Sequence, residues 1–483
     1  MKRSLILLLS CIIILSFVVC KQQPVDQMDW KEDNSNKWFE QKLDHFDMQN
    51  NQTFKTRYWV NYDHWLREGD YGPLILYLCG EWTCSNQRKD GYVFSLAKKY
   101  KALLVVHEHR YYGMSQPFDD WSTENLRWLN TDQALADVAY FATSLSEKFS
   151  SRYNIPQKRW LVIGGSYPGA LVSWFRNKYP HIAFGAWSSS GVVDAVQDFH
   201  QFDEQVTASM MKSGSWCPEI VRNLIVYTNT EFDQGRGDAI KAQFNATSMP
   251  DDEFYWFYSD VIAETVQYGG RTELCQRVKE LDGNWTQMNQ MINDWQVGRI
   301  VGRDDYWSAA LVNTTIDYGK NGRQWTYQYC SELGYLQTPA QKYPPLKNDA
   351  MNLTFWKNYC SRIFKRETFP DTYLWNLRYG GKAPSITNVI YMNGEEDPWK
   401  QAGILKYKGD KSVHTFELKC DNCAHCIDLN ASLESPPRAI AVARSKSEKI
   451  VQGWINTEKL MESLGIDSAE KEIMSVQYLL KQE

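Results

Sequence analysis

The sequence has no excess of basic residues. Its 53 Lys and Arg stand against 58 Asp and Glu, which gives a net charge of −5 at pH 7. Proteins that bind nucleic acids neutralise phosphates with clustered cations, and no basic stripe is present here. Internal repeats and heptad runs are also lacking, and only one long apolar run occurs, at the beginning. These absences exclude nucleic-acid partners, coiled coils and a chain with several membrane spans.

The one long apolar run covers residues 5–19. It follows a short basic start and contains only Leu, Ile, Val, Phe, Ser and Cys. A basic start before an apolar run of this length is typical of a secretory signal peptide, whereas a membrane-spanning helix needs about 20 apolar residues. We therefore predict a signal peptide over residues 1–20 and a mature protein in the secretory pathway without a membrane anchor. Its destination, the extracellular medium or a lysosome or vacuole, stays open.

Six Asn-x-Ser/Thr sequons agree with that route. One sequon arises easily by chance, but six behind a signal peptide predict N-glycosylation. The sequon asparagines are Asn51, Asn245, Asn284, Asn313, Asn352 and Asn430.

Cysteine usage also fits an oxidising compartment. Of 11 cysteines, Cys11 and Cys20 fall in the predicted signal peptide. The other nine would mostly be paired, with at least one left over. Cys79 and Cys84 flank a short turn and are placed to pair.

Two groups of residues could suggest a metal, and neither has a complete ligand set. Cys420, Cys423 and Cys426 lack a second pair of cysteines or histidines at ligand spacing. His107 and His109 would share one face of a strand, but no third ligand is near them in the sequence. We predict neither a metal nor a cofactor.

Short β-type runs alternate with helical patterns at both ends of the mature chain. Strands are expected at 73–78, 102–107, 160–163, 182–188, 387–391 and 413–417. Helices are expected at 130–145, from the glycine-rich turn at 164–169 to about 178, and at about 436–455. Such alternation predicts an α/β fold with a mostly parallel sheet. Between 195 and 340 the sequence becomes polar and helix-rich, with helices expected at 203–213 and 219–232. We predict a core of residues 21–194 and 341–483, interrupted by a helical cap at 195–340.

The candidate nucleophile lies in a glycine-rich turn. The strand at 160–163 runs into Gly164-Gly-Ser166-Tyr-Pro-Gly169 and then into a helix. This order is the context of a nucleophile elbow, where glycines let the strained turn approach neighbouring chains. The pattern G-x-S-x-G is met in part, because Pro168 precedes the second glycine. The alternative is a glycine-rich turn with an incidental serine.

In a hydrolase with this elbow, the acid and then the histidine follow the serine in sequence. The histidines after Ser166 are His181, His200, His414 and His425. Only His425 lies in a loop after the last strand, where a general base is expected. Glu395, Glu396 and Asp397 follow the strand at 387–391, and spacing alone leaves the choice among them open. Asp397 precedes a proline and is therefore held extended.

Six blocks of the chain resemble the serine peptidase family of lysosomal Pro-Xaa carboxypeptidase, dipeptidyl-peptidase II and thymus-specific serine peptidase. The blocks are Gln41–Phe46, Glu108–Gly113, Gln133–Asp137, Gly164–Gly169 with Trp174–Arg176, Asn393–Trp399 and the loop around His425. The resemblance implies an α/β-hydrolase core with a helical cap inserted after the nucleophile. It also implies Ser166 as nucleophile, Asp397 as acid and His425 as base, in hydrolysis next to proline at one end of a peptide.

Further site residues follow from the same resemblance. The oxyanion hole would use the N–H of Tyr167 and one from Gly80 or Glu81, although family members carry more glycines around this glutamate. We expect Trp399 to contribute to an aromatic slot for proline.

The family pattern also guides two cysteine pairings. It suggests that Cys217 pairs with Cys275 and that Cys330 pairs with Cys360. Beside the expected base, Cys423 or Cys426 is then the expected leftover.

We therefore expect a secreted or lysosomal serine exopeptidase that acts on proline-containing peptides through an acyl-enzyme. The residues after His425 are nearer the thymus-specific type than the basic sequence of some relatives. A carboxypeptidase and a dipeptidyl peptidase both stay open, as does a homodimer.

Three alternatives are less favoured. An α/β-hydrolase esterase would fit the same core, but the lipase-type HGGG motif is absent. A catalytically inactive hydrolase-fold binding protein is disfavoured because all three triad candidates are present. A carbohydrate-active enzyme would need Glu395 and Asp397 on opposite sides of a glycosidic bond, and neighbours in one turn are poorly placed for that.

Overall fold

The computed structural model describes residues 35–67, 71–85, 91–296, 302–430 and 435–466. The predicted signal peptide lies outside these ranges. Among the helices within them, none combines the length and the apolar character that a bilayer crossing requires.

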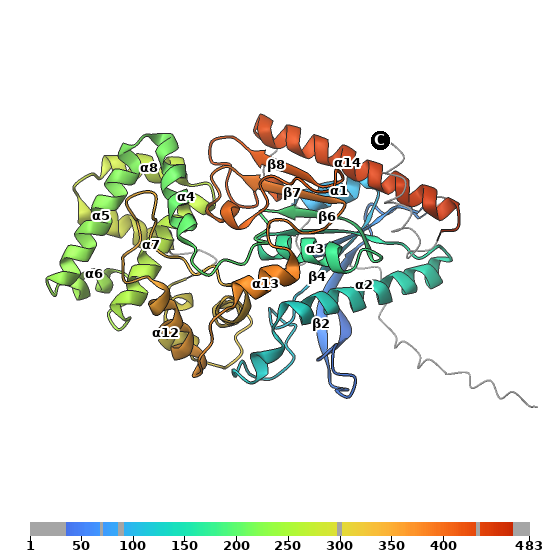
Figure 1. Cartoon of the computed structure of the whole chain (residues 1–483), viewed down its shortest axis with the longest axis horizontal. Coiled ribbons are helices and arrows are strands. Elements are labelled where there is room, and N and C mark those ends of the chain that lie inside the picture. The colour runs from blue at the N-terminus through green and yellow to red at the C-terminus, as the bar shows by residue number, and fades with distance from the viewer. Residues whose placement is uncertain (1–34, 68–70, 86–90, 297–301, 431–434, 467–483) are drawn as a thin grey trace, which may run out of the picture. The chain divides into compact units, whose positions relative to one another are not determined.

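An eight-stranded sheet forms the centre of the fold (Figure 1). Its strands are β1 (Lys37–Lys42), β2 (Thr53–Asn61), β3 (Leu74–Leu78), β4 (Leu103–His107), β5 (Trp160–Gly165), β6 (Ala183–Ser189), β7 (Val389–Gly394) and β8 (His414–Leu418). They lie in the order β1-β2-β4-β3-β5-β6-β7-β8. The pairs β1·β2 and β2·β4 are antiparallel, and every other pair is parallel. The expected mostly parallel sheet is confirmed.

The six strands expected from the sequence are β3 to β8, whereas β1 and β2 were not foreseen. The residues of β1 alternate between buried and exposed. Its buried side chains include Lys37 and Gln41, while Trp38 is exposed. The polarity of this strand therefore does not follow its burial, and the alternation cannot be seen in the sequence.

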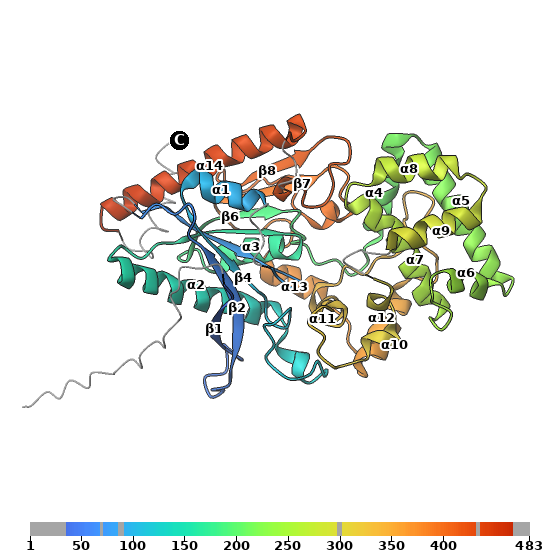
Figure 2. The ribbon, with the colours of Figure 1, turned by 180° about the vertical axis from the view of Figure 1, so that it is seen from behind.

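Helices cover both faces of the sheet. Figures 1 and 2 show α1 (Tyr92–Tyr100) and α14 (Arg438–Ser463) on one face, and α2 (Thr131–Tyr153) and α3 (Tyr167–Lys178) on the other. Helix α2 begins where the sequence predicted it, because the side chain of Asn130 accepts a hydrogen bond from the Gln133 N–H, as an N-cap does.

Most other helices lie between β6 and β7 in sequence. They are α4 (His200–Met210), α5 (Trp216–Asp233), α6 (Gly237–Gln243), α7 (Asp251–Gln267), α8 (Arg271–Glu280), α9 (Trp285–Gln296), α10 (Ser308–Leu311), α11 (Gly322–Gln328), α12 (Leu353–Phe364) and α13 (Thr372–Tyr379). Short helical segments connect them: η2 (Met211–Ser213), η3 (Arg303–Asp305) and η4 (Tyr329–Leu333). Helices α4 and α7 pack against η5 (Pro398–Ala402), the segment that follows β7. The cap boundaries at 195 and 340 stay a prediction.

Three of the sequence blocks that carry the family resemblance meet at one buried carboxylate. Asp137 on α2 accepts hydrogen bonds from Nε and Nη2 of Arg110, both at 2.6 Å. His45 Nε2 lies 2.8 Å from Asp137 Oδ1, and the Gln41 side chain donates a hydrogen bond to the carbonyl oxygen of Asp137. Burial raises the pKa of Asp137, but the Arg110 guanidinium and His45 outweigh that effect, so its pKa is lowered. These blocks therefore hold the segments that follow β1 and β4 against α2.

Replacing Asp137 should test this role. Asp137→Ala leaves Arg110 buried without its counter-charge, so we expect the free energy of unfolding to fall by about 3–5 kcal/mol. Equilibrium urea unfolding of the secreted protein measures the change. Glu147→Ala, an exposed position on the same helix, is the matched control and should leave the midpoint nearly unchanged. Equal midpoints for the two variants would contradict the role.

Candidate active site

The turn between β5 and α3 holds Ser166 in an unusual backbone conformation. Its φ is 65° and its ψ is −130°, which few residues other than glycine adopt. A Cβ on Gly164 would lie 2.3 Å from the Pro168 carbonyl oxygen, and one on Gly169 would lie 2.6 Å from that of Ser189. Both positions therefore require glycine. The second glycine stands one place later than in the G-x-S-x-G pattern because Pro168 occupies the first turn of α3, a position that suits proline.

Asp397 and His425 form a buried pair. His425 Nδ1 lies 2.8 Å from Asp397 Oδ2, and Asp397 Oδ1 accepts a hydrogen bond from the Trp399 N–H at 2.9 Å. The carboxylate comes directly after β7, and the imidazole comes from the loop after β8. A proton on Nδ1 leaves Nε2 as the nitrogen that can accept another proton. Burial lowers the pKa of His425, but Asp397 and, to a smaller extent, Cys426 together outweigh that effect, so the pKa lies well above its ordinary value.

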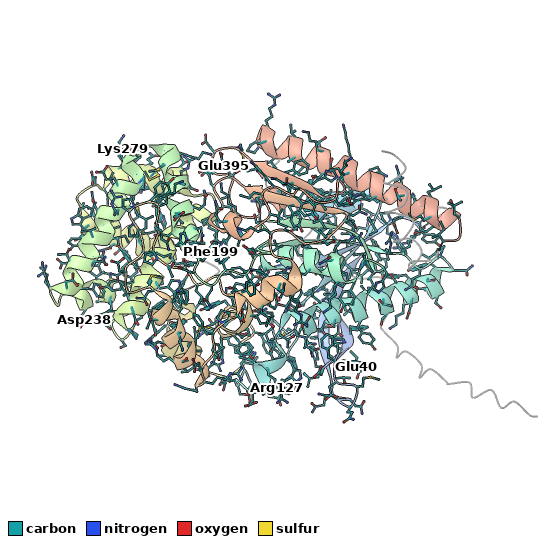
Figure 3. The ribbon with its side chains drawn as sticks, in the orientation of Figure 1. Glu40, Arg127, Phe199, Asp238, Lys279 and Glu395 are labelled. Carbon is teal, nitrogen blue, oxygen red and sulfur yellow. A yellow bond between two sulfur atoms is a disulfide. The ribbon has the colours of Figure 1, made fainter. Side chains whose placement is uncertain are left out.

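The structure separates the three adjacent acids of the β7 loop. Asp397 faces His425, whereas Glu396 is buried and pairs with Arg271 of α8. Glu395 is half-buried and pairs with Lys212 of η2. Figure 3 shows Glu395 where the β7 and β8 loops meet the helices that lie between β6 and β7 in sequence. Only one of the three acids is thus placed to act on the imidazole.

The His425 loop packs against the serine turn. The Cys426 N–H donates a hydrogen bond to Ser190 Oγ at 2.9 Å, just beyond the end of β6. A Cβ on Gly165 would lie 2.9 Å from Cys426 Sγ, so a larger residue would push the loop away. Among the described residues, no hydrogen bond joins the Ser166 hydroxyl to the His425 ring. Catalytic hydrogen bonds are often long without substrate, and the packing brings both side chains to the same edge of the sheet.

The expected oxyanion loop lies on the other side of Ser166. A Cβ on Gly80 would lie 2.3 Å from the Pro168 side chain and 3.5 Å from that of Tyr167, so the chain after β3 touches the start of α3. Tyr167 is the first residue of α3, where backbone N–H groups have no partner within the helix. Gly80, Glu81 and Tyr167 therefore lie close to Ser166, and their role in an oxyanion hole stays a prediction.

The side chain of Glu81 is a feature that sequence reasoning missed. Burial raises the pKa of Glu81 to about 7, although the charge of His425 and a hydrogen bond from Ser166 lower it. Its Oε2 is inaccessible and accepts no hydrogen bond from any described residue. The sequence offered Glu81 only as a backbone donor, because nothing in the pattern shows where its carboxyl group points.

Trp399 lies in an aromatic cluster formed with Phe199, Phe202 and Tyr335. The ring centroids lie 5.8, 5.1 and 5.6 Å from that of Trp399. Its indole N–H donates to Oε1 of Gln267, at the end of α7, at 2.8 Å. Figure 3 labels Phe199, which immediately precedes α4. The cluster surrounds the tryptophan with rings next to Asp397.

Behind Ser166, the Tyr167 side chain joins a buried hydrogen-bond network. Its hydroxyl lies 3.1 Å from His109 Nε2 and accepts a hydrogen bond from Gln328 of α11 at 2.9 Å. His109 Nδ1 donates to the Arg110 carbonyl oxygen at 2.7 Å, and burial lowers the pKa of His109 to about 4. The imidazole is thus neutral and serves the network. Among the described residues, no group of three or more His, Cys, Asp and Glu could hold a metal ion.

Among the described residues, eight cysteines form four disulfides. The expected pairs Cys79–Cys84, Cys217–Cys275 and Cys330–Cys360 are confirmed, and Cys420 pairs with Cys423. Cys426 is a free thiol. Of the two expected leftovers, Cys426 is therefore correct and Cys423 is wrong. The pairing of Cys420 with Cys423 also removes two candidate zinc ligands, because thiolates are what bind zinc.

All six sequon asparagines, named above, are exposed in the structure. Exposure is what glycosylation needs, and glycosylation itself stays a prediction.

This strand order, with a strained serine turn after β5, an acid after β7 and a histidine after β8, defines an α/β-hydrolase. Residues 41–447 match the family described as serine carboxypeptidase S28, and the chain belongs to this family. It is therefore a serine-type peptidase, and its substrates are peptides.

Relatives of known name cover most of the chain. "Probable serine protease EDA2" of Arabidopsis thaliana is 35% identical over 83% of this chain and 82% of its own. Bovine lysosomal Pro-X carboxypeptidase is 30% identical over 87% and 88%, and mouse thymus-specific serine protease is 28% identical over 88% of each chain. Among solved structures, proline iminopeptidase of Mycobacterium smegmatis is 11% identical, with a TM-score of 0.35 and coverage of 87% and 99%.

The opposing effects on His425 predict how its ionisation responds to mutation. In Asp397→Asn the carboxylate is lost and burial remains, so we expect the pKa of His425 to be lower than in the wild type. An NMR titration of isotope-labelled histidine rings measures it, with His425→Gln to assign the signal. Asp410→Asn, in the loop before β8, is the matched control. An unshifted His425 titration in Asp397→Asn would contradict the electrostatic account.

Proposed function

We propose that this protein is a serine exopeptidase of the secretory pathway that hydrolyses peptide bonds next to proline through an acyl-enzyme on Ser166. The observation that carries the proposal is the buried contact of 2.8 Å between His425 Nδ1 and Asp397 Oδ2, in a loop packed against the strained Ser166 turn. Serine, histidine and aspartate so arranged are the components of nucleophilic acyl transfer.

In the proposed mechanism, His425 Nε2 takes the Ser166 proton as Oγ attacks the scissile carbonyl. Asp397 keeps the other proton on Nδ1 and stabilises the imidazolium that forms. The oxyanion lies against the Tyr167 N–H and an N–H of Gly80 or Glu81. His425 then gives its proton to the leaving amine, and water hydrolyses the acyl-enzyme by the same route.

Two observations support proline as the specificity element. The Trp399 cluster offers flat aromatic surfaces beside Asp397, and a proline ring packs well on such surfaces. The bovine relative is named a Pro-X carboxypeptidase. The word lysosomal in that name, with the predicted signal peptide, supports a lysosomal or extracellular location.

Peptide cleavage tests this proposal. The purified protein and its Ser166→Ala variant are incubated with Lys-Pro-Xaa-type and Xaa-Pro-Phe peptides at about pH 5 and 7, which lie on either side of the ordinary pKa of histidine. Mass spectrometry identifies the products. We expect cleavage next to proline by the wild type and a loss of about a millionfold in Ser166→Ala. Ser151→Ala, an exposed serine on α2, is the matched control and should cleave normally.

Each outcome has a definite meaning. Release of an N-terminal dipeptide identifies a dipeptidyl peptidase, and release of one C-terminal residue identifies a carboxypeptidase. Undiminished cleavage by Ser166→Ala would overturn the triad. If neither form cleaves peptides while p-nitrophenyl esters are hydrolysed, the protein is an esterase instead.

A further inference from the structure

One short segment between β6 and β7 contacts both loops that carry the acid and the base. We define it as the α7–α8 turn, residues 267–272, which ends α7 and begins α8. In sequence it lies more than 100 residues before either loop. Its contacts with the two loops are hydrogen bonds and ion pairs rather than loose packing.

On the side of the base, the α7–α8 turn binds the backbone of the histidine loop. The His425 N–H donates to the Gln267 carbonyl oxygen at 2.9 Å. The backbone N–H and the hydroxyl of Thr272 donate to Asn422 Oδ1 at 3.2 and 3.0 Å. Gly269 has a φ of +82°, and a Cβ there would lie 3.1 Å from the Asn422 carbonyl oxygen. The α7–α8 turn therefore packs closely against the histidine loop at Gly269, where a side chain would crowd the Asn422 carbonyl oxygen.

On the side of the acid, Arg271 forms an ion pair with Glu396, the residue before Asp397. Its Nε and Nη2 donate to the two oxygens of Glu396 at 3.0 and 2.9 Å, a bidentate arrangement. Glu396 is fully buried, and its Oε1 also accepts from the Asn422 N–H at 3.0 Å. One carboxylate therefore ties the acid loop, the base loop and α8 together.

We propose that Arg271 is a positioning residue for the catalytic triad, holding Glu396 so that Asp397 stays within hydrogen-bond distance of His425. This inference rests on the proposed function. The physical basis is that a misplacement of about 1 Å in a catalytic group can cost about 100-fold in rate. Arg271 acts through Glu396, and among the described residues no hydrogen bond or ion pair joins Arg271 to Ser166 or to His425.

The pKa of His425 depends on the groups that face it, so a change in that pKa can reveal whether Arg271 positions Asp397. These groups are Asp397 from the β7 loop, Glu81 from the loop after β3, Tyr268 from the α7–α8 turn and Cys426 beside it in sequence. Asp397 is the group that raises the pKa of His425 most. If Asp397 moves away, that pKa falls and neutral His425 persists to lower pH, so the acidic limb of kcat/KM shifts to lower pH.

The test compares Arg271→Gln with the wild type on the peptide that the wild type cleaves. A fluorophosphonate that labels the serine counts active sites, so kcat is expressed per competent site. We expect kcat to fall about 10- to 100-fold with KM within about twofold, and the acidic limb to move to lower pH. Arg271→Lys should recover part of kcat, because lysine keeps the charge without the bidentate fork.

The matched control is Arg277→Gln on the same helix. Arg277 is exposed and pairs with Glu280 within α8, so this variant should behave as the wild type.

Two results would overturn the proposal. One is an unchanged kcat per site and pH profile in Arg271→Gln. The other is a loss of activity that fewer labelled sites account for, with the acidic limb unmoved, which is what a purely structural role predicts. If Arg271→Gln is not secreted, the same criteria apply to Arg271→Lys and Glu396→Gln. Failure of the triad itself is distinguishable, because Ser166→Ala would then stay active.

Discussion

The buried hydrogen bond between Asp397 and His425 is the interaction on which the rest of this site depends. Burial disfavours the charge on either group, so the pair is stable only while each faces the other and remaining polar atoms are satisfied. The Trp399 N–H donates a hydrogen bond to the second oxygen of Asp397, and the Gln267 carbonyl oxygen accepts one from the His425 N–H. Much of the surrounding structure keeps the loops after β7 and β8 in the relative position that this hydrogen bond requires.

The sheet makes the first contribution to that relative position. Strands β5, β7 and β8 belong to the parallel part of the sheet, so the segments that follow them emerge at one edge. Ser166, Asp397 and His425 each lie just beyond such a strand end. The helices between β6 and β7 make the second contribution to the position of the loops. Gln267 accepts a hydrogen bond from the loop after β8, and Arg271 pairs with Glu396 in the loop after β7. The segment expected to cap the site therefore also helps to build it.

Buried charges have different roles in different parts of this molecule. Asp137 and Arg110 are fully paired and hold the segments that follow β1 and β4 against α2, far in sequence from the catalytic candidates. Glu396 and Arg271 are paired across two elements beside the site. The pKa of Glu81 is raised by burial to about 7, and the charge of His425 only partly offsets that effect. A buried acid with a raised pKa is more frequent at functional sites than elsewhere, which agrees with the proposed role of Ser166.

The sequence predicted the α/β class, six of the eight strands and the glycine-bounded turn at Ser166, and the loop position of His425 made it the expected base. These are local properties, set by hydrophobic runs, turn residues and chain order. Spacing alone left the choice among Glu395, Glu396 and Asp397 open, because adjacent acids differ only in what they face, and the family resemblance was needed to favour Asp397. The folded structure shows the contact of Asp397 with His425, and it adds two contacts that the sequence did not predict, those of Glu396 with Arg271 and of the Glu81 carboxyl group with Ser166. Those contacts join residues far apart in the chain, and only the folded packing brings them within hydrogen-bond distance.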